Sequence, residues 1–401
     1  MAVQEYPAPE SVNRLQTRAF GVGAIALLLA IFGAVRSPET FFPSYLMSFL
    51  LVLGLALGSL GLVMLQHLTS GHWGIVIRRP LESATRTLPL LAIAFLPIAI
   101  FGMRYLYTGH GHEKGWLNAP ASGEGALSNF QKSYLTHNGY LLRAFIYFAV
   151  WLGLMFIFNI LSKQQDINRD DRALRQRFKM LAGPGIILYV FAMSFAAIDW
   201  VMSISPHWAS TIYGFIFVGG QLISSMSFMI AVVVLLARAE PLAGILQPRH
   251  LHDLGKLLLA FVMLWAYFDF SQLLIIWSGN QPEEISFYRT RLYGEWGVVA
   301  LIVVIFHFFV PFFLLLSQDL KRRAQVISKI AVWLILMRLV DLFWMTRPEF
   351  TSSAVPSWLD LVLPIALGGL WLGFFAFNLK QCPLLPLGDP DLAEAIKNHE
   401  H

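Results

Sequence analysis

The chain has 401 residues, of which 57% are hydrophobic and only 13% are charged. Soluble domains have roughly 45–50% apolar and about 25% charged residues, so this composition excludes an ordinary soluble enzyme or binding module. The net charge of +5 does not indicate a nucleic-acid partner, because the basic residues are spread over short loops instead of one surface. We therefore expect an all-α integral membrane protein that binds no nucleic acid.

Ten apolar stretches follow one another along the chain, and each is long enough, at about 17 to 25 residues, to cross a hydrocarbon core of roughly 30 Å as a helix. The ten predicted transmembrane helices cover residues 19–35, 42–65, 88–106, 141–161, 180–200, 212–237, 257–277, 296–316, 326–345 and 358–377. The polar segment before the first helix contains two glutamates and no cleavage site follows that helix, so we expect it to be retained as a span. Pro97 and Pro311 predict kinks in the third and eighth helices.

Lysine and arginine residues alternate in number from loop to loop. With these spans, 19 of them lie on one side of the membrane, seven lie on the other, and three lie inside spans. The positive-inside rule places the richer side in the cytoplasm, together with both termini. The asymmetry also indicates an even number of spans, because one missed helix would scramble the alternation.

The histidines and the single cysteine limit the cofactors that the chain could hold. Cys382 alone excludes an intramolecular disulfide, a cysteine-ligated iron–sulfur cluster and a c-type haem site. Only His307 lies deep within a span, whereas a b-type haem needs two facing histidines. His110 and His112 lie in the longest outer loop, residues 107–140, and we expect them to be solvated instead of binding a metal. No metal-bound or covalently attached cofactor is expected.

Four ionisable residues lie at a common depth in the predicted spans. A charge at the centre of a membrane helix costs on the order of 2.5–3.5 kcal/mol, so such residues tend to mark a pathway or a partner. By helical rise, Asp269, His307, Arg338 and Asp341 lie about 20, 15, 18 and 22 Å from the cytoplasmic ends of their spans. We interpret them as a proton relay, which Gln272 would extend. The alternative is that Arg338 and Asp341 form a structural pair while His307 bonds to a backbone carbonyl.

A second polar group lies at the outer ends of the earlier helices. Its members are Arg104, His137, Arg143, Asp199 and His207. Quinol oxidation needs hydrogen-bonding and proton-accepting groups at the mouth of an apolar cleft, so His137, Arg143, Asp199 and His207 are candidate quinone contacts. The alternative is interfacial anchoring and loop packing.

Two long stretches resemble a known family. Residues 199–214 (DWVMSISPHWASTIYG) and 252–284 (HDLGKLLLAFVMLWAYFDFSQLLIIWSGNQPEE) closely resemble the NrfD-like membrane subunits of alternative complex III, a bacterial quinol:cytochrome c or cupredoxin oxidoreductase. The similarity extends over essentially all ten spans, and the length is closest to the shorter NrfD-like member, the F subunit. The resemblance implies a small residue at position 269, where this chain has Asp.

The resemblance implies a single polytopic domain over residues 1–401. Its first four-helix bundle would cover about residues 42–200 (helices 2–5) and its second about 212–345 (helices 6–9), with flanking helices at 19–35 and 358–377. It also implies the bacterial cytoplasmic (inner) membrane, structural lipids, and a proton path through the bundles. The implied partners are a paralogous NrfD-like subunit, an iron–sulfur subunit and c-type haem subunits, with a terminal oxidase as a further candidate.

The working hypothesis is a subunit without a redox centre of its own that conducts protons and supports quinol oxidation by its paralogue. Whether the chain itself binds quinone or menaquinone stays open, and so does whether it is quinone-associated or wholly non-catalytic. The alternatives are a free-standing secondary transporter and a purely structural membrane anchor.

Overall fold

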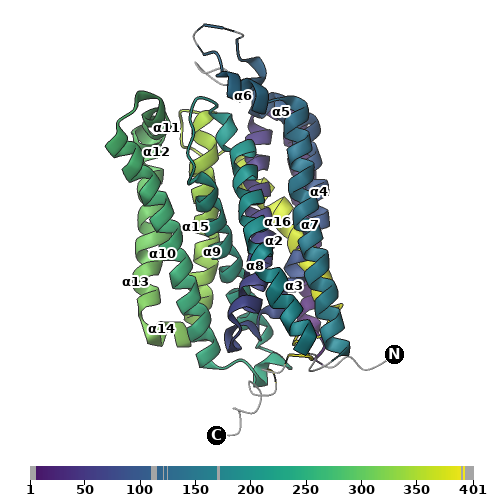
Figure 1. Ribbon diagram of the computed structural model, residues 1–401. Helices are drawn as coiled ribbons and strands as arrows, with labels where there is room; N and C mark the ends of the chain where they lie inside the picture. Colours follow the sequence, from purple (N-terminus) through teal and green to yellow (C-terminus); the bar gives the residue numbers. More distant parts are fainter. Residues whose placement is uncertain are drawn as a thin grey trace.

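The computed structural model describes residues 6–109, 115–120, 122–123, 125–168, 172–389 and 392. Within these residues every regular element is helical, and the long helices run side by side (Figure 1). The lower end in Figure 1 carries α3 (Arg78–Thr85) and α14 (Gln318–Arg322), and the upper end carries α6 (Asn129–Tyr134) and α11 (Pro282–Leu292).

Most of the long helices are continuous. They are α1 (Glu10–Arg36), α2 (Pro38–Thr69), α7 (His137–Ile167), α8 (Arg172–Trp200), α9 (Tyr213–Leu236), α10 (Pro248–Gly279), α15 (Ala324–Thr346) and α16 (Trp358–Leu379). Two more are composites of shorter pieces: α3, α4 (Leu88–Pro97), η2 (Ile98–Gly102) and α5 (Met103–Leu106) form one, and α12 (Gly294–Val303), η6 (Val304–Phe309) and α13 (Val310–Leu316) form the other. The short 3₁₀ turns are η1 (His72–Gly74), η3 (Trp116–Asn118), η4 (Met202–Ile204), η5 (Leu242–Gly244) and η7 (Arg347–Glu349).

Nine helices within the described part of the chain are long and apolar enough to cross a membrane, which makes this a multi-pass membrane protein. The helix that does not qualify is α15, although its 23 residues would extend about 35 Å. Every 18-residue stretch of α15 contains Lys329, Arg338 and Asp341. Its charges, and not its length, therefore set it apart from the other nine.

The outward faces of the helices are apolar, as lipid-facing surfaces are. Leu28 on α1 and Phe145 on α7 are 69% and 71% exposed, and Trp277 near the upper end of α10 is 70% exposed. These side chains have no protein neighbour to cover them, so the surrounding lipid would do so.

Helix α2 lies at the centre of the molecule. All its residues from Phe41 to Met64 are buried, which fits a helix that is hydrophobic all round. It packs against α3, α8, α9, α15 and α16. At Gly58 a Cβ atom would lie 2.2 Å from the Gln221 carbonyl oxygen, so the backbones of α2 and α9 are in direct contact. One core therefore joins the early and late helices.

Helices α1 and α16 form a closely packed pair on the side of this core. A Cβ atom at Gly23 would lie 2.7 Å from the Leu370 backbone nitrogen, and one at Gly369 would lie 2.8 Å from the Gly23 Cα atom. Small residues of this kind let membrane helices approach closely. The pair joins the first and last parts of the chain, and the Leu384 N–H donates to the Tyr6 carbonyl over 2.9 Å at the lower end.

Both prolines that predict kinks adjoin π-helical turns. Segment η2 follows Pro97, and segment η6 precedes Pro311. Proline has no N–H and its ring crowds the carbonyl four residues earlier, which for Pro311 is that of His307. The turn widens there, because the N–H of Val310 bonds to the carbonyl of Ile305, five residues back. Such π-turns are often found at functional sites.

The helices are longer at the lower end than the apolar runs predict. Helix α1 begins at Glu10 instead of residue 19, α8 at Arg172 instead of 180, and α10 at Pro248 instead of 257. The predicted spans count only apolar residues, whereas a helix continues past the lipid wherever its polar residues find water or partners.

Candidate functional site

The central feature of the site is an ion pair on α15, between Arg338 and Asp341. Both side chains are almost completely buried, at 2% and 1% exposure, and the Arg338 guanidinium donates directly to the Asp341 carboxylate. The guanidinium lies against Gly220 of α9, where a Cβ atom would come within 2.1 Å of its Cζ atom. It also lies 5.7 Å from the centre of the Phe217 ring. The pair thus occupies a space that α9 leaves open for it.

His307 is fully enclosed beside this pair. It lies in η6, and its ring stacks on Trp265 of α10 with 4.4 Å between the ring centres and 14° between the planes. Neither ring nitrogen has a partner in hydrogen-bond geometry among the described residues. The Met337 backbone is nevertheless a hydrogen-bond partner of the imidazole at looser geometry, and the charge of Arg338 acts on the ring. The enclosure of this imidazole beside ionisable groups makes it a candidate for proton exchange.

Asp269 completes the group from α10, one helical turn above Trp265. The residue is partly exposed, and its carboxylate lies within electrostatic range of Asp341 and Arg338. The described residues offer it no hydrogen bond. The structure thus brings Asp269, His307, Arg338 and Asp341 together from three neighbouring helices.

Gln272 lies one turn further up α10 and links two other elements. Its side-chain oxygen accepts a hydrogen bond from Ser210 at 2.7 Å, and its Nε2 donates to the Tyr288 hydroxyl on α11 at 3.0 Å. Burial raises the pKa of the Tyr288 hydroxyl, and the negative charge of Asp269 raises it further, so the phenol stays protonated. Gln272 therefore extends the polar group toward the upper end.

A second buried ion pair lies above this group. Arg291 of α11 is 1% exposed, donates to Glu349 at 2.7 Å, and donates to the Met345 carbonyl at 3.0 Å. Glu349 lines a cavity of about 620 Å³ between α11, α12 and η7. Between the two ion pairs lies the buried hydroxyl of Tyr213, which has no hydrogen-bond partner among the described residues and feels the charges of both. Polar groups thus continue from the Asp341 level to the upper surface.

Arg143 and Asp199 form the best-defined contact of the predicted quinone group. The guanidinium donates twice to the carboxylate, at 2.8 and 2.9 Å, and Tyr147 donates to the same carboxylate at 2.6 Å. The guanidinium also lies 3.8 Å from the centre of the Tyr134 ring. Asp199 is completely buried. This carboxylate is saturated by its own neighbours.

The other members of that predicted group lie apart from this pair. His137, His207 and Arg104 are exposed. An apolar cavity of about 350 Å³ lies nearby, between α6, α8 and η4, and its polar walls include Tyr134 and Ser203. Burial and then the charge of Asp199 raise the pKa of Tyr134 to about 12. Neither His137 nor His207 lines this cavity.

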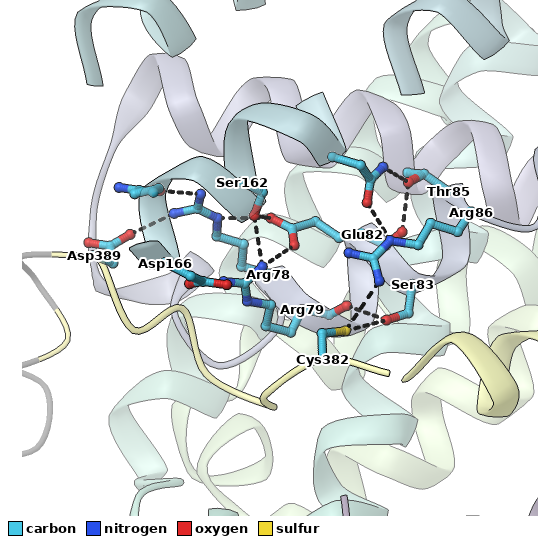
Figure 2. Close-up of polar contacts among 12 residues, drawn as sticks. Arg78, Arg79, Glu82, Ser83, Thr85, Arg86, Ser162, Asp166, Cys382 and Asp389 are labelled. Atoms are coloured by element: carbon cyan, nitrogen blue, oxygen red, sulfur yellow. Dashed lines mark hydrogen bonds and ion pairs between the residues drawn. The ribbon is translucent and has the colours of Figure 1, made fainter. Parts of the chain in front are cut away.

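A polar cluster at the lower end is missing from the sequence-based prediction. Figure 2 shows Arg78, Arg79 and Glu82 of α3 pointing toward one another and toward α7. Each is 1% exposed. The Glu82 carboxylate accepts from Arg78 at 3.1 Å, from Arg79 at 2.7 Å and from Ser162 at 2.7 Å. A single carboxylate thus binds two buried guanidinium groups.

The same cluster ties down the C-terminal segment. Arg78 donates to Asp389 at 2.9 Å and to Gln165 at 2.5 Å, while Arg86 donates to the Cys382 sulfur at 3.3 Å (Figure 2). Arg79 pairs with Asp166 on α7. From the sequence, these arginines were expected in a short loop on the cytoplasmic side. A glutamate within the run RRPLESATR, at helical spacing from the arginines, is the signal that could have indicated a buried network.

No protein-family model matches the chain, and no curated protein sequence matches it significantly. Within the described ranges, no three histidine, cysteine, aspartate or glutamate side chains are grouped so that they could hold a metal ion. His110 and His112 lie outside the described residues.

Proposed function

We propose that the chain is a membrane subunit of a quinol:electron-acceptor oxidoreductase of the alternative complex III type, and that it conducts protons through its second helix bundle. Ten helices, including α15, cross a bacterial cytoplasmic membrane in this proposal, with the lower end and both termini in the cytoplasm. The resemblance of residues 199–214 and 252–284 to NrfD-like subunits, most of all the F subunit, supports it. Its partners are then an NrfD-like paralogue, iron–sulfur and c-type haem subunits, and a terminal oxidase.

The packing of the helices fits the two bundles of that family. Helices α2, α7, α8 and the α3–α5 composite make up the proposed first bundle, and α9, α10, α15 and the α12–α13 composite make up the second. Helices α1 and α16 are the flanking pair. The relay residues all belong to the second bundle.

The observation that carries the proton-conducting role is the enclosed imidazole of His307. The His307 ring is completely buried, with the Met337 backbone as a partner at looser geometry and the charge of Arg338 acting on it. The same guanidinium pairs with Asp341 and acts on the carboxylate of Asp269. An imidazole enclosed with ionisable groups from three helices can bind and release a proton, through water or a neighbouring carboxylate, and such groups within a membrane tend to mark a pathway.

The route would exchange protons with the outer side. From Asp269 and Asp341, the polar groups of Gln272, Tyr288 and Tyr213 lead upward toward the cavity lined by Glu349. Each of these groups can donate and accept a hydrogen bond or carries a carboxylate.

The test uses the chain in its native membrane assembly, purified through a tag on this subunit. Asp341→Asn removes the central proton-accepting group, and His307→Phe keeps the ring that stacks on Trp265 but removes its nitrogens. Each variant should lower proton-coupled quinol turnover by about 10²-fold, which is the usual contribution of one acid–base group. Turnover and the proton-to-electron ratio are measured in vesicles with a pH-sensitive dye.

Asp319→Asn is the matched control, because this aspartate is exposed on α14. It should leave both quantities unchanged. An assembled His307→Phe complex with normal turnover and stoichiometry would favour the structural anchor. A chain that purifies without haem-bearing partners and moves a solute in vesicles would favour the secondary transporter.

A quinone contact at the upper end of the first bundle is a second candidate function, and the apolar cavity beside Tyr134 favours it. Arg143 and Asp199 would then order Tyr134, whereas His137 and His207 would contact quinone only outside this cavity. Ala209→Trp would narrow this cavity and should raise the KM for quinol, whereas Ile25→Trp on the exposed face of α1 should not. Equal KM values in both variants would place quinone or menaquinone elsewhere.

A further inference from the structure

A small polar cavity lies at the lower end, where α2, α7 and α8 end beside the C-terminal segment. Its volume is about 140 Å³. The side chains that line it are Gln66, His67, Ser70, Arg78, Gln165, Arg175, Phe178, Lys179 and Asp389. It lies outside the second bundle, so the proton relay makes no use of it.

Two of the side chains that line this cavity are buried and carry an unpaired polar atom. His67 is 8% exposed and Gln66 is 5% exposed. Within the described residues, neither the His67 Nε2 atom nor the Gln66 Oε1 atom has a hydrogen-bond partner. Leaving two such groups unpaired is costly, so the protein interior alone does not satisfy this wall of the cavity.

The positions of both side chains are fixed by packing. The His67 ring stacks on Phe178 with 4.0 Å between ring centres and 12° between planes. A Cβ atom at Gly74 would lie 2.1 Å from the Gln66 Cγ atom, so the following loop holds Gln66 in place. The His67 ring and the Gln66 stem are therefore preorganised, while the terminal amide of Gln66 keeps the choice of its two orientations.

The charges around the cavity are mostly positive. Arg175 and Lys179 lie one helical turn apart on α8 and are exposed at its edge. Arg78 lies in the wall, and the single carboxylate among the lining residues, that of Asp389, is already paired with it at 2.9 Å. An anion would meet cationic and neutral donors from several sides.

We propose that this cavity binds a phosphate group, either the headgroup of an anionic phospholipid or free inorganic phosphate. Its oxygens accept hydrogen bonds in several directions at once, which matches donors on α2 and α8. His67 Nε2 in its protonated tautomer, the Ser70 hydroxyl and the Gln66 amide, turned so that its NH₂ faces the cavity, supply the neutral donors. Arg175 and Lys179 supply the charge, as basic residues do at an anionic membrane surface.

The experiment compares two double variants of the full chain with the same change in net charge. Arg175→Gln/Lys179→Gln removes the two cations of the cavity, while Lys163→Gln/Arg177→Gln removes two exposed cations from the same ends of α7 and α8. His67→Phe keeps the stacked ring and removes its donor. Each delipidated protein is titrated with inorganic phosphate and, separately, reconstituted with phosphatidylglycerol and analysed by native mass spectrometry.

We expect the cavity double variant to bind phosphate or the lipid about tenfold more weakly, or worse, and the control double variant to bind like the original chain. His67→Phe should bind more weakly than the control. Loss of lipid binding alone identifies a headgroup site, and loss of phosphate binding alone identifies a soluble ligand. Equal binding by the two double variants, for both ligands, would overturn the proposal.

Discussion

Gly220 gives Arg338 the space in which it pairs with Asp341. The guanidinium lies where any side chain at position 220 would begin, since a Cβ atom there would be 2.1 to 2.6 Å from three of its atoms. Removing one partner of a buried ion pair costs about 3–5 kcal/mol, because the other charge is left uncompensated. A glycine of α9 therefore leaves the space that this buried guanidinium occupies.

Gly220→Ala should push the guanidinium away from Asp341 and destabilise the protein by up to about 3 kcal/mol, together with a loss of proton-coupled turnover. The control is Gly183→Ala on α8, where a Cβ atom would meet no described atom within 4 Å. That control should be neutral or up to about 1 kcal/mol more stable, since alanine favours helix over glycine. Thermal unfolding in detergent measures both, and equal stability of the two variants would contradict the close packing described for Arg338.

The helices show how local irregularities place the chemistry. Pro311 removes the donor that the His307 carbonyl would otherwise bind, and the resulting π-turn sets the direction of the imidazole. The glycines of α1 and α16 do not distort their helices. They lack side chains, so the two helix backbones can come into direct contact. Pro311 therefore alters the helix beside His307, whereas the glycines allow α1 and α16 to pack closely.

Gly23→Val should separate α1 from α16, because a Cβ atom at this position already lies 2.7 Å from a backbone nitrogen that cannot move aside. Gly21→Val is the matched control two residues away, where a Cβ atom would have no described neighbour within 4 Å. We expect the first change to lower stability by about 1–3 kcal/mol and the second by less than about 1 kcal/mol. Thermal unfolding and protease sensitivity of the purified chain would show the difference.

At the level of the whole molecule, the two described chain ends meet at the lower end. The hydrogen bond from Leu384 to Tyr6 and that from Lys380 to Asn13, at 2.7 Å, join the segments that flank α1 and α16. An even number of membrane crossings requires only that both ends lie on one side, and the proposed ten-span topology places this end in the cytoplasm.

Cysteine labelling tests that orientation in intact cells. The native Cys382 is 7% exposed and should react slowly with a membrane-impermeant maleimide, so the unchanged chain serves as the background. Ser122→Cys and Ser352→Cys at the upper end should be labelled from outside. Lys163→Cys near the lower end should be labelled only after the membrane is permeabilised. The reverse pattern would invert the proposed topology.

The sequence alone predicts the membrane class and places most spans, because long apolar runs determine both. It also predicts that Arg338 and Asp341 can pair, since three residues separate them on one helix. It could not predict the network around Glu82. There the partners of Arg78 and Arg79 come from α7 and from Asp389, far along the chain, and a run of arginines before a span equally fits a solvated loop.

The sequence could not predict the surroundings of the His307 imidazole either. The depth of this residue follows from counting along the helix, but its enclosure between Trp265 and the Arg338 side chain depends on how three helices pack. Asp199 bonds to Arg143 and Tyr147, whereas His137 and His207 are exposed. The spacing of these residues in the sequence could not predict this difference. Helical spacing fixes depth and face, whereas partners depend on tertiary packing.

The pairing of α1 with α16 has a consequence for how the protein is made. About 320 residues separate these helices, so at about 5–20 residues per second the ribosome needs roughly 15–65 s to deliver the second after the first. During that interval α1 lies in the bilayer without α16, the helix with which it packs most extensively. Helix α2 likewise lacks α9, α15 and α16, which cover it in the folded protein. Until α16 is inserted, the glycine-containing face of α1 in the nascent chain must therefore be covered by lipid or by an insertion factor.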